Sequence, residues 1–130
     1  MTSPQKTVLI VEDEADAADL FAEMMRVSGF RVLKTSSSAP ALSMMTAEKP
    51  DIVLLDIMMP DISGLDILRQ MRADPELTNI PVVVVSAKSM PADIKNGMEA
   101  GASTYLTKPV GFLELKEAVE RALGSQSAAL

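Results

Sequence analysis

The chain has 130 residues, of which 48% are hydrophobic and 23% are charged. This length and this balance suit one globular domain with a single hydrophobic core. The net charge of −6 argues against nucleic acid as a direct partner, because nucleic-acid-binding proteins present clustered lysine and arginine. The chain has no cysteine and no histidine, which excludes disulfides, thiol chemistry, zinc sites of the usual nitrogen and sulfur type, and histidine-based acid–base catalysis.

Neither a signal peptide nor a membrane span is visible in the sequence. Residues 1–6 lack the apolar core of a signal peptide. No apolar run approaches the roughly 20 residues that cross a bilayer. We therefore expect a cytoplasmic protein that does not associate with membranes.

The first part of the chain alternates short apolar runs with helical patterns. Residues 7–11 are a predicted strand, and residues 14–27 a predicted helix that stops at Gly29. A weaker strand at 30–33 precedes a helix that runs to about residue 48, with the serines at 36–38 as its N-cap. The spacing directs five side chains of the first helix towards the core: Ala17, Leu20, Phe21, Met24 and Met25.

The middle of the chain repeats this alternation. Residues 52–55 are apolar at every position, which is typical of a strand buried on both faces. Ser63 is the predicted cap of a helix that runs to about residue 72, where Asp74 and Pro75 break the pattern. A second fully apolar run, residues 82–85, predicts another buried strand.

The last part of the chain holds two more helices and one more strand. The helix at 91–100 contains Gly97, which should make it the loosest of the helices, and stops at Gly101. A strand at 104–106 precedes a helix at 111–123. We expect one domain over residues 1–124 and a frayed tail at 125–130. Five strand–helix units with right-handed crossovers predict an α/β fold, with a parallel sheet covered by helices on both faces.

Acidic, hydroxyl or lysine side chains stand at the ends of four of the predicted strands. The strand ends carry Glu12 with Asp13, then Asp56, then Ser86, and finally Lys108. A single aspartate at a strand end is usually a turn or cap residue. The carboxyl ends of parallel strands, however, meet at the edge where α/β sheets bind ligands. Four such ends together favour one site.

The residue types at this edge indicate magnesium and phosphoryl transfer. Three carboxylates repel one another unless positive charge lies among them, and Lys108 and a divalent cation would supply it. Oxygen ligands without histidine or cysteine favour Mg²⁺. A carboxylate beside Mg²⁺, a lysine and a hydroxyl can attack phosphorus to form an aspartyl phosphate. The cation and the lysine would neutralise the phosphoryl oxygens, while Ser86 donates a hydrogen bond to them.

The same segments resemble the receiver domain of response regulators, the phosphoacceptor module of two-component signalling. The resemblance covers about residues 6–123 and implies a flavodoxin-like (βα)5 fold with strand order 2-1-3-4-5. It rests on four motifs taken together: Val11-Glu12-Asp13-Glu14, Leu55-Asp56-Ile57-Met58-Met59-Pro60-Asp61-Ile62-Ser63-Gly64, Val85-Ser86-Ala87 and Tyr105-Leu106-Thr107-Lys108-Pro109.

The resemblance implies roles for the acidic residues. Asp56 would accept a phosphoryl group from a sensor histidine kinase or a histidine phosphotransfer protein. Asp13, Asp56 and the backbone carbonyl of Met58 would bind Mg²⁺, and Glu12 would act through a water molecule. The peptide bond before Pro109 would be cis, as is typical of the family.

The resemblance also implies how the phosphoryl state would be read and removed. Lys108 would contact the phosphoryl group, and Ser86 and Tyr105 would form the switch. Their movement would remodel the surface made by the fourth helix, fifth strand and fifth helix, to which a downstream protein or a second copy would bind. Met58 and Lys88 would tune the rate of dephosphorylation.

Two alternatives stay open at this point. A magnesium-dependent phosphatase of the haloacid-dehalogenase type needs a second acid two residues after its nucleophile, where this chain has Met58. A receiver-like binding module usually lacks the acceptor, an acid or the lysine, all of which are present. We expect a signalling protein that is an enzyme only towards its own aspartyl phosphate. With no output domain after the last helix, it would be a free-standing regulator or a receiver cut from a longer protein.

Overall fold

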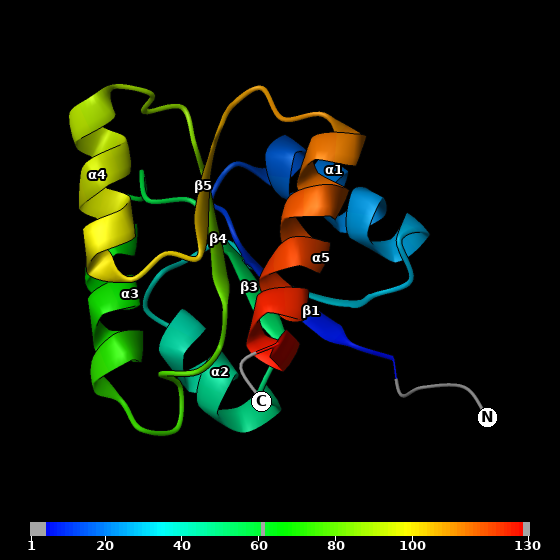
Figure 1. The fold of residues 1–130 in the computed structure, drawn as a ribbon, viewed down its shortest axis with the longest axis horizontal. Helices are drawn as coiled ribbons and strands as arrows, with labels where there is room; N and C mark the ends of the chain where they lie inside the picture. Colours follow the sequence, from blue (N-terminus) through cyan, green and yellow to red (C-terminus); the bar gives the residue numbers. More distant parts are fainter. Residues whose placement is uncertain (1–4, 61, 129–130) are drawn as a thin grey trace.

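The computed structural model of the chain describes residues 5–60 and 62–128, in which strands and helices alternate (Figure 1). The strands are β1 (Thr7–Val11), β2 (Arg31–Thr35), β3 (Ile52–Leu55), β4 (Val82–Ser86) and β5 (Thr104–Thr107). The helices are α1 (Ala15–Val27), α2 (Ala41–Glu48), α3 (Gly64–Ala73), α4 (Pro91–Ala100) and α5 (Phe112–Ala128). The predicted order of elements is confirmed.

The strands form one parallel sheet in the order β2-β1-β3-β4-β5, as the resemblance implied. The chain winds outward from β1 to β2 and then returns to place β3 on the other side of β1. The carboxyl ends of β1 and β3 therefore lie at the point where the winding reverses, which is where open α/β sheets hold their ligands.

The helices cover both faces of the sheet. α1 and α5 pack on one face, and α2 and α3 pack on the other, where α4 also lies (Figure 1). Alternate residues of β1 serve the two layers: Val8 and Ile10 contact the α1/α5 side, while Leu9 and Val11 contact the α2/α3 side. Burial on both faces explains why β1, β3 and β4 are apolar at almost every position.

One inward assignment in α1 was wrong. Phe21 and Met25 are buried as predicted, but Leu20 is 53% exposed. The buried stripe consists of Ala18, Phe21, Ala22 and Met25. At 100° per residue, Leu20 points away from the centre of that stripe. It lies instead at the rim of a depression beside the carboxyl ends of the strands.

The predicted serine cap of α2 was also wrong. Pro40 occupies the N-cap position, and no side chain caps the helix. A proline suits a helix start because the N–H groups there have no partner within the helix. The Ser38 hydroxyl instead donates to the Ile62 carbonyl at 2.7 Å, so it connects this loop to the loop after β3. The predicted cap of α3 by Ser63 is confirmed.

The last helix is longer than predicted. It runs to Ala128, although an end near Leu123 and a tail from residue 125 were expected. A glycine stops a helix when it adopts the left-handed conformation, as Gly29 and Gly101 do with φ of 97° and 117°. Gly124 does not adopt it, and the helix continues. Residues 129 and 130 lie outside the described residues, and the domain limits remain a prediction.

Candidate functional site

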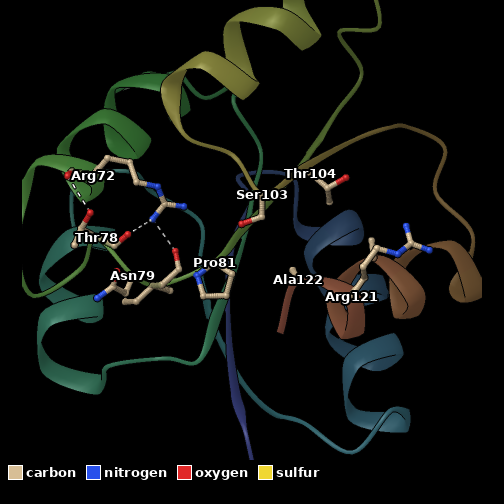
Figure 2. A pocket seen from close by; sticks show the side chains of 10 residues that line it. Arg72, Thr78, Asn79, Pro81, Ser103, Thr104, Arg121 and Ala122 are labelled. Atoms are coloured by element: carbon tan, nitrogen blue, oxygen red, sulfur yellow. Dashed lines mark hydrogen bonds between the residues drawn. The ribbon is translucent and has the colours of Figure 1, made fainter. Parts of the chain in front are cut away.

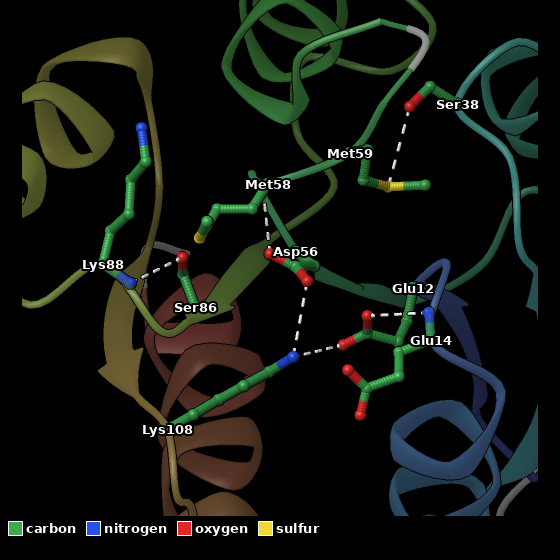
Figure 3. A network of polar contacts seen from close by, with 9 residues as sticks. All are labelled: Glu12, Glu14, Ser38, Asp56, Met58, Met59, Ser86, Lys88 and Lys108. Atoms are coloured by element: carbon green, nitrogen blue, oxygen red, sulfur yellow. Dashed lines mark hydrogen bonds and ion pairs between the residues drawn. The ribbon is translucent and has the colours of Figure 1, made fainter.

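The side chains predicted to form one site do meet at the carboxyl edge of the sheet (Figure 3). Glu12 follows β1, Asp56 follows β3, Ser86 ends β4 and Lys108 follows β5. Glu12 is 2% exposed, Asp56 7% and Ser86 0%. Buried polar side chains of this kind need partners, and each of them has at least one within the site.

Three acids at this edge are close enough to share a cation. Carboxylate oxygens of Glu12, Asp13 and Asp56 lie within 4.8 Å of one another, and Asp13 is exposed. A donor set made only of oxygen fits a hard divalent cation such as Mg²⁺. The Met58 N–H donates to Asp56 Oδ1 at 2.9 Å, which places the Met58 peptide beside the cluster. The role of its carbonyl as a ligand remains a prediction.

Lys108 supplies positive charge to two of these acids. Its Nζ donates to Glu12 Oε1 at 2.7 Å and to Asp56 Oδ2 at 3.4 Å, and it lies 5.9 Å from the centre of the Phe21 ring. Burial lowers the pKa of Lys108, but the hydrogen bond with Glu12 and the charge of Asp56 outweigh it, so the pKa is raised overall. The lysine is therefore held in its charged form. The peptide bond to Pro109 is cis, as the resemblance implied.

Both carboxylate oxygens of Glu12 accept a hydrogen bond. Oε1 accepts from Lys108, and Oε2 accepts from the Glu14 N–H at 3.2 Å. Burial raises the pKa of the Glu12 carboxyl, opposed by the hydrogen bond from Lys108 and reinforced by the charge of Asp56. Two carboxylates thus share one ammonium group, and the cluster keeps an excess of negative charge that a cation can neutralise. Contact between Glu12 and Mg²⁺ through water remains a prediction.

Gly64, eight residues after Asp56, lets the start of α3 lie close to the backbone that follows Asp56. A Cβ atom at Gly64 would lie 2.5 Å from the Ile57 Cα and 2.6 Å from the Asp56 carbonyl oxygen. The first turn of α3 therefore approaches the peptide that follows Asp56 more closely than any side chain permits. The sequence motif contained Gly64, but its spacing alone did not show what the glycine contacts.

Ser86 and Tyr105 are connected through the backbone of one residue. The Lys88 N–H donates to Ser86 Oγ at 3.2 Å, and the Tyr105 hydroxyl donates to the Lys88 carbonyl at 2.7 Å. Burial raises the pKa of the half-buried Tyr105 hydroxyl, the nearby Ser86 side chain opposes this, and the charges of Asp93 and Asp56 reinforce it, so the pKa is raised overall. This use of Lys88 had no signal in the sequence, because every residue except proline offers the same two backbone groups.

The site opens into a depression of about 810 Å³. Ala17, Leu20 and Phe21 of α1 line one side of it, and Asp56 and Lys108 lie within it. The depression leaves the Asp56 carboxylate accessible from solvent, although most of its own surface is covered.

A second cavity, of about 460 Å³, lies at the opposite edge of the sheet, around Arg72 (Figure 2). The Arg72 guanidinium donates twice to the Gly101 carbonyl, at 3.0 and 2.8 Å, and to the carbonyls of Thr78 and Ile80 at 3.0 and 2.7 Å. These bonds join α3 to the loops before β4 and β5. Arg72 is thus engaged by the backbone, and its role here is structural.

Residues 8–120 match the model of the response regulator receiver domain. The chain belongs to this family. A curated relative, the polar-differentiation response regulator DivK of Brucella ovis, is 34% identical over 119 residues, which cover 92% of this receiver domain and 97% of that protein. The predicted membership is confirmed, and with it the assignment to two-component signalling.

Solved structures of other receiver domains share the fold. A putative response regulator from Chloroflexus aurantiacus has a TM-score of 0.90 and 29% identity, covering 93% of this chain and 99% of that one. The receiver domain of a sensor histidine kinase from Pseudomonas aeruginosa has a TM-score of 0.86 and 26% identity, with the same coverage, and holds a magnesium ion in its active site cleft. Within the described residues of this receiver domain, no helix is both long and apolar enough to span a membrane.

Proposed function

We propose that this receiver domain accepts a phosphoryl group on Asp56 from the phosphohistidine of a sensor histidine kinase or a histidine phosphotransfer protein, with Mg²⁺ as cofactor. One observation carries the proposal. The buried Asp56 carboxylate lies 3.4 Å from the Lys108 ammonium group and within 4.8 Å of two further acids, at the end of an open depression. These contacts support the proposal, which needs a nucleophile, a fixed positive charge and ligands for a cation close together.

Each residue of the site has a separate role in the proposed transfer. Asp56 Oδ1 is oriented by the Met58 N–H, and an Asp56 oxygen attacks phosphorus while the bond from phosphorus to the donor imidazole nitrogen breaks. The imidazole keeps the electron pair of that bond. Lys108 neutralises charge on the phosphoryl oxygens. Bound Mg²⁺ would supply further positive charge, held by Asp13, Asp56, the Met58 carbonyl and, through water, Glu12.

Phosphorylation would then be read through Ser86. Its Oγ would turn towards the phosphoryl oxygens and release the Lys88 N–H that it now accepts from. Because the Lys88 carbonyl also accepts from Tyr105, a change in the backbone of Lys88 would reach the tyrosine and the surface made by α4, β5 and α5. A downstream protein or a second copy of the chain would bind that surface. The event is a shift between two existing conformations.

The test is intact mass after incubation with acetyl phosphate and Mg²⁺. We expect a gain of one phosphoryl group in the parent protein, and no gain in Asp56→Asn or in the presence of EDTA. A gain that survives Asp56→Asn, or no gain at all, overturns the proposal. Repeated fast turnover of a small phosphate ester would instead favour the phosphatase alternative, because a receiver domain releases the group that it accepts only slowly.

Met58 is proposed to set the lifetime of the phosphoryl group, as is Lys88 on the other side of the site. The Met58 side chain is 46% exposed and cannot orient a water molecule by hydrogen bonding. Met58→Asn is therefore expected to shorten the lifetime several-fold, measured as loss of phosphoryl mass after acetyl phosphate is removed. Met59→Asn is the control, because Met59 points towards Ser38 (Figure 3). Equal decay in Met58→Asn and the parent would contradict this role.

A further inference from the structure

Helix α4 is attached to the sheet in a different way from the other helices. Across α4, which lies wholly within the described residues, Gly97 is the only buried residue. α1 and α3 each bury large apolar side chains, including Phe21 and Met25 in the first and Ile67 and Met71 in the second. The partly buried Ala100 also packs against the core, but no large apolar side chain of α4 is fully buried.

The contact at Gly97 is made with the ring of Tyr105. A Cβ atom at Gly97 would lie 2.8 Å from Cδ2 and 3.0 Å from Cε2 of that ring. The hydroxyl at the other end of the ring donates to the Lys88 carbonyl at 2.7 Å. The ring thus lies against the backbone of α4, with its hydroxyl fixed by the loop after β4.

A glycine in the middle of a helix lowers the stability of that helix relative to alanine. From the sequence, Gly97 was expected to make α4 the loosest of the helices. Its surroundings favour a steric explanation, because a glycine that only adds flexibility does not require a close neighbour. Gly124 in α5 shows the contrast, since a Cβ atom there would meet nothing within 4 Å.

We infer that Gly97 is the positioning residue for Tyr105: the missing side chain creates the space in which the ring lies, and thereby couples the position of the ring to that of α4. A methyl group at Gly97 would push the ring towards solvent and break its bond to Lys88. This packing role stands on the contacts alone. Its consequence for signalling rests on the proposed function, in which Tyr105 is part of the switch.

Tyr105 is also a convenient reporter, because the chain has one tyrosine and no tryptophan. In Gly97→Ala we expect acrylamide to quench tyrosine fluorescence more strongly and the near-ultraviolet circular dichroism of the tyrosine to weaken. Gly124→Ala is the matched control and should leave both signals as in the parent. Unchanged quenching and dichroism in Gly97→Ala would overturn the inference.

A second experiment tests whether the Tyr105 ring itself is the obstacle to a side chain at position 97. It uses thermal melting, which does not depend on tyrosine fluorescence. We expect Gly97→Ala to lower the melting temperature of the parent but to raise that of Tyr105→Ala. Gly124→Ala should raise the melting temperature in both backgrounds. The sign reverses because alanine favours a helix once the ring is gone. Gly97→Ala lowering the melting temperature equally in both backgrounds would overturn the inference, since the obstacle would then be another part of the structure.

A third measurement separates this inference from the proposed function. Beryllofluoride with Mg²⁺, a mimic of the phosphoryl group, should change the tyrosine fluorescence of the parent and of Gly124→Ala, and change that of Gly97→Ala much less. An equal response in Gly97→Ala, with the quenching and melting results as expected, overturns the proposed switching role of Tyr105 and supports the packing role alone.

Discussion

Replacing Lys108 with methionine is expected to lower the free energy of unfolding by about 3 kcal/mol in metal-free buffer, because removal of one partner leaves buried charges uncompensated. Methionine keeps most of the length and apolar surface of the lysine stem. What it removes is the ammonium group 2.7 Å from Glu12 and 3.4 Å from Asp56, two carboxylates that are almost fully buried. Urea unfolding, followed by far-ultraviolet circular dichroism, measures the loss.

Two conditions should reduce this deficit. Mg²⁺ should stabilise Lys108→Met more than the parent, because the cation replaces the missing charge and binds only the folded form. Lower pH should act in the same direction. Burial raises the pKa of Glu12 and the hydrogen bond from Lys108 lowers it, so removal of Lys108 should raise this pKa further. The stability that protonation of Glu12 contributes is present below the ordinary carboxyl range and is lost as pH rises through the raised value.

The matched control for Lys108 is Lys95→Met. Lys95 pairs with Glu99 at 3.8 Å on the surface of α4, with both side chains well exposed. Such pairs contribute about 0 to 1 kcal/mol, so this variant should keep the stability of the parent. If Lys108→Met were as stable as Lys95→Met without metal, the acids at the carboxyl edge would not depend on the lysine for their charge balance.

Replacing Arg72 with methionine is expected to lower the free energy of unfolding by about 3 kcal/mol, because hydrogen bonds from a charged donor contribute about 1.5 to 3 kcal/mol each and some of the freed carbonyls will gain water instead. Three carbonyls lose their donor, those of Thr78, Ile80 and Gly101. The Arg72 side chain also packs against Gly101: a Cβ atom at Gly101 would lie 2.6 Å from the Arg72 Cγ.

Arg69→Met is the matched control. It makes the same substitution on the same helix, at an arginine for which no hydrogen bond to a backbone carbonyl is seen among the described residues. Arg69 is bound to Asp66 at 3.0 Å, with both side chains 57% exposed. Its loss should change stability by less than about 0.5 kcal/mol. Thermal melting of the two variants side by side is sufficient. A loss in Arg72→Met no larger than in Arg69→Met would show that the loops before β4 and β5 do not depend on the guanidinium.

The sequence was informative where the physical rule is local to the chain. Runs such as residues 52–55 can be buried on both faces only in a sheet covered by helices, which predicted the layers. The acids at 12, 13 and 56 came together because every strand of a parallel sheet has its carboxyl end at the same edge. The predicted left-handed stop at Gly101 is confirmed for the same reason, since a left-handed turn favours glycine.

The sequence failed where the answer depends on a neighbour distant in the chain. Ser38 had the chemistry of a cap, but a carbonyl 24 residues away accepts its hydrogen bond. Lys88 acts through peptide groups that no residue type reveals. Gly97 was assigned looseness because its contact with the Tyr105 ring depends on how α4 lies against β5.

The backbone contact of α4 has a consequence for how such a domain can diverge. Six residues of α4 are exposed, so changes among them remove little from the hydrophobic core: Pro91, Ala92, Lys95, Asn96, Met98 and Glu99. The outer surface of this helix can therefore acquire a new pattern of charge and shape while the sheet and the acids at its edge stay the same. If partners bind this helix, as proposed above, related domains can differ in their partners while the residues at the edge of the sheet stay the same.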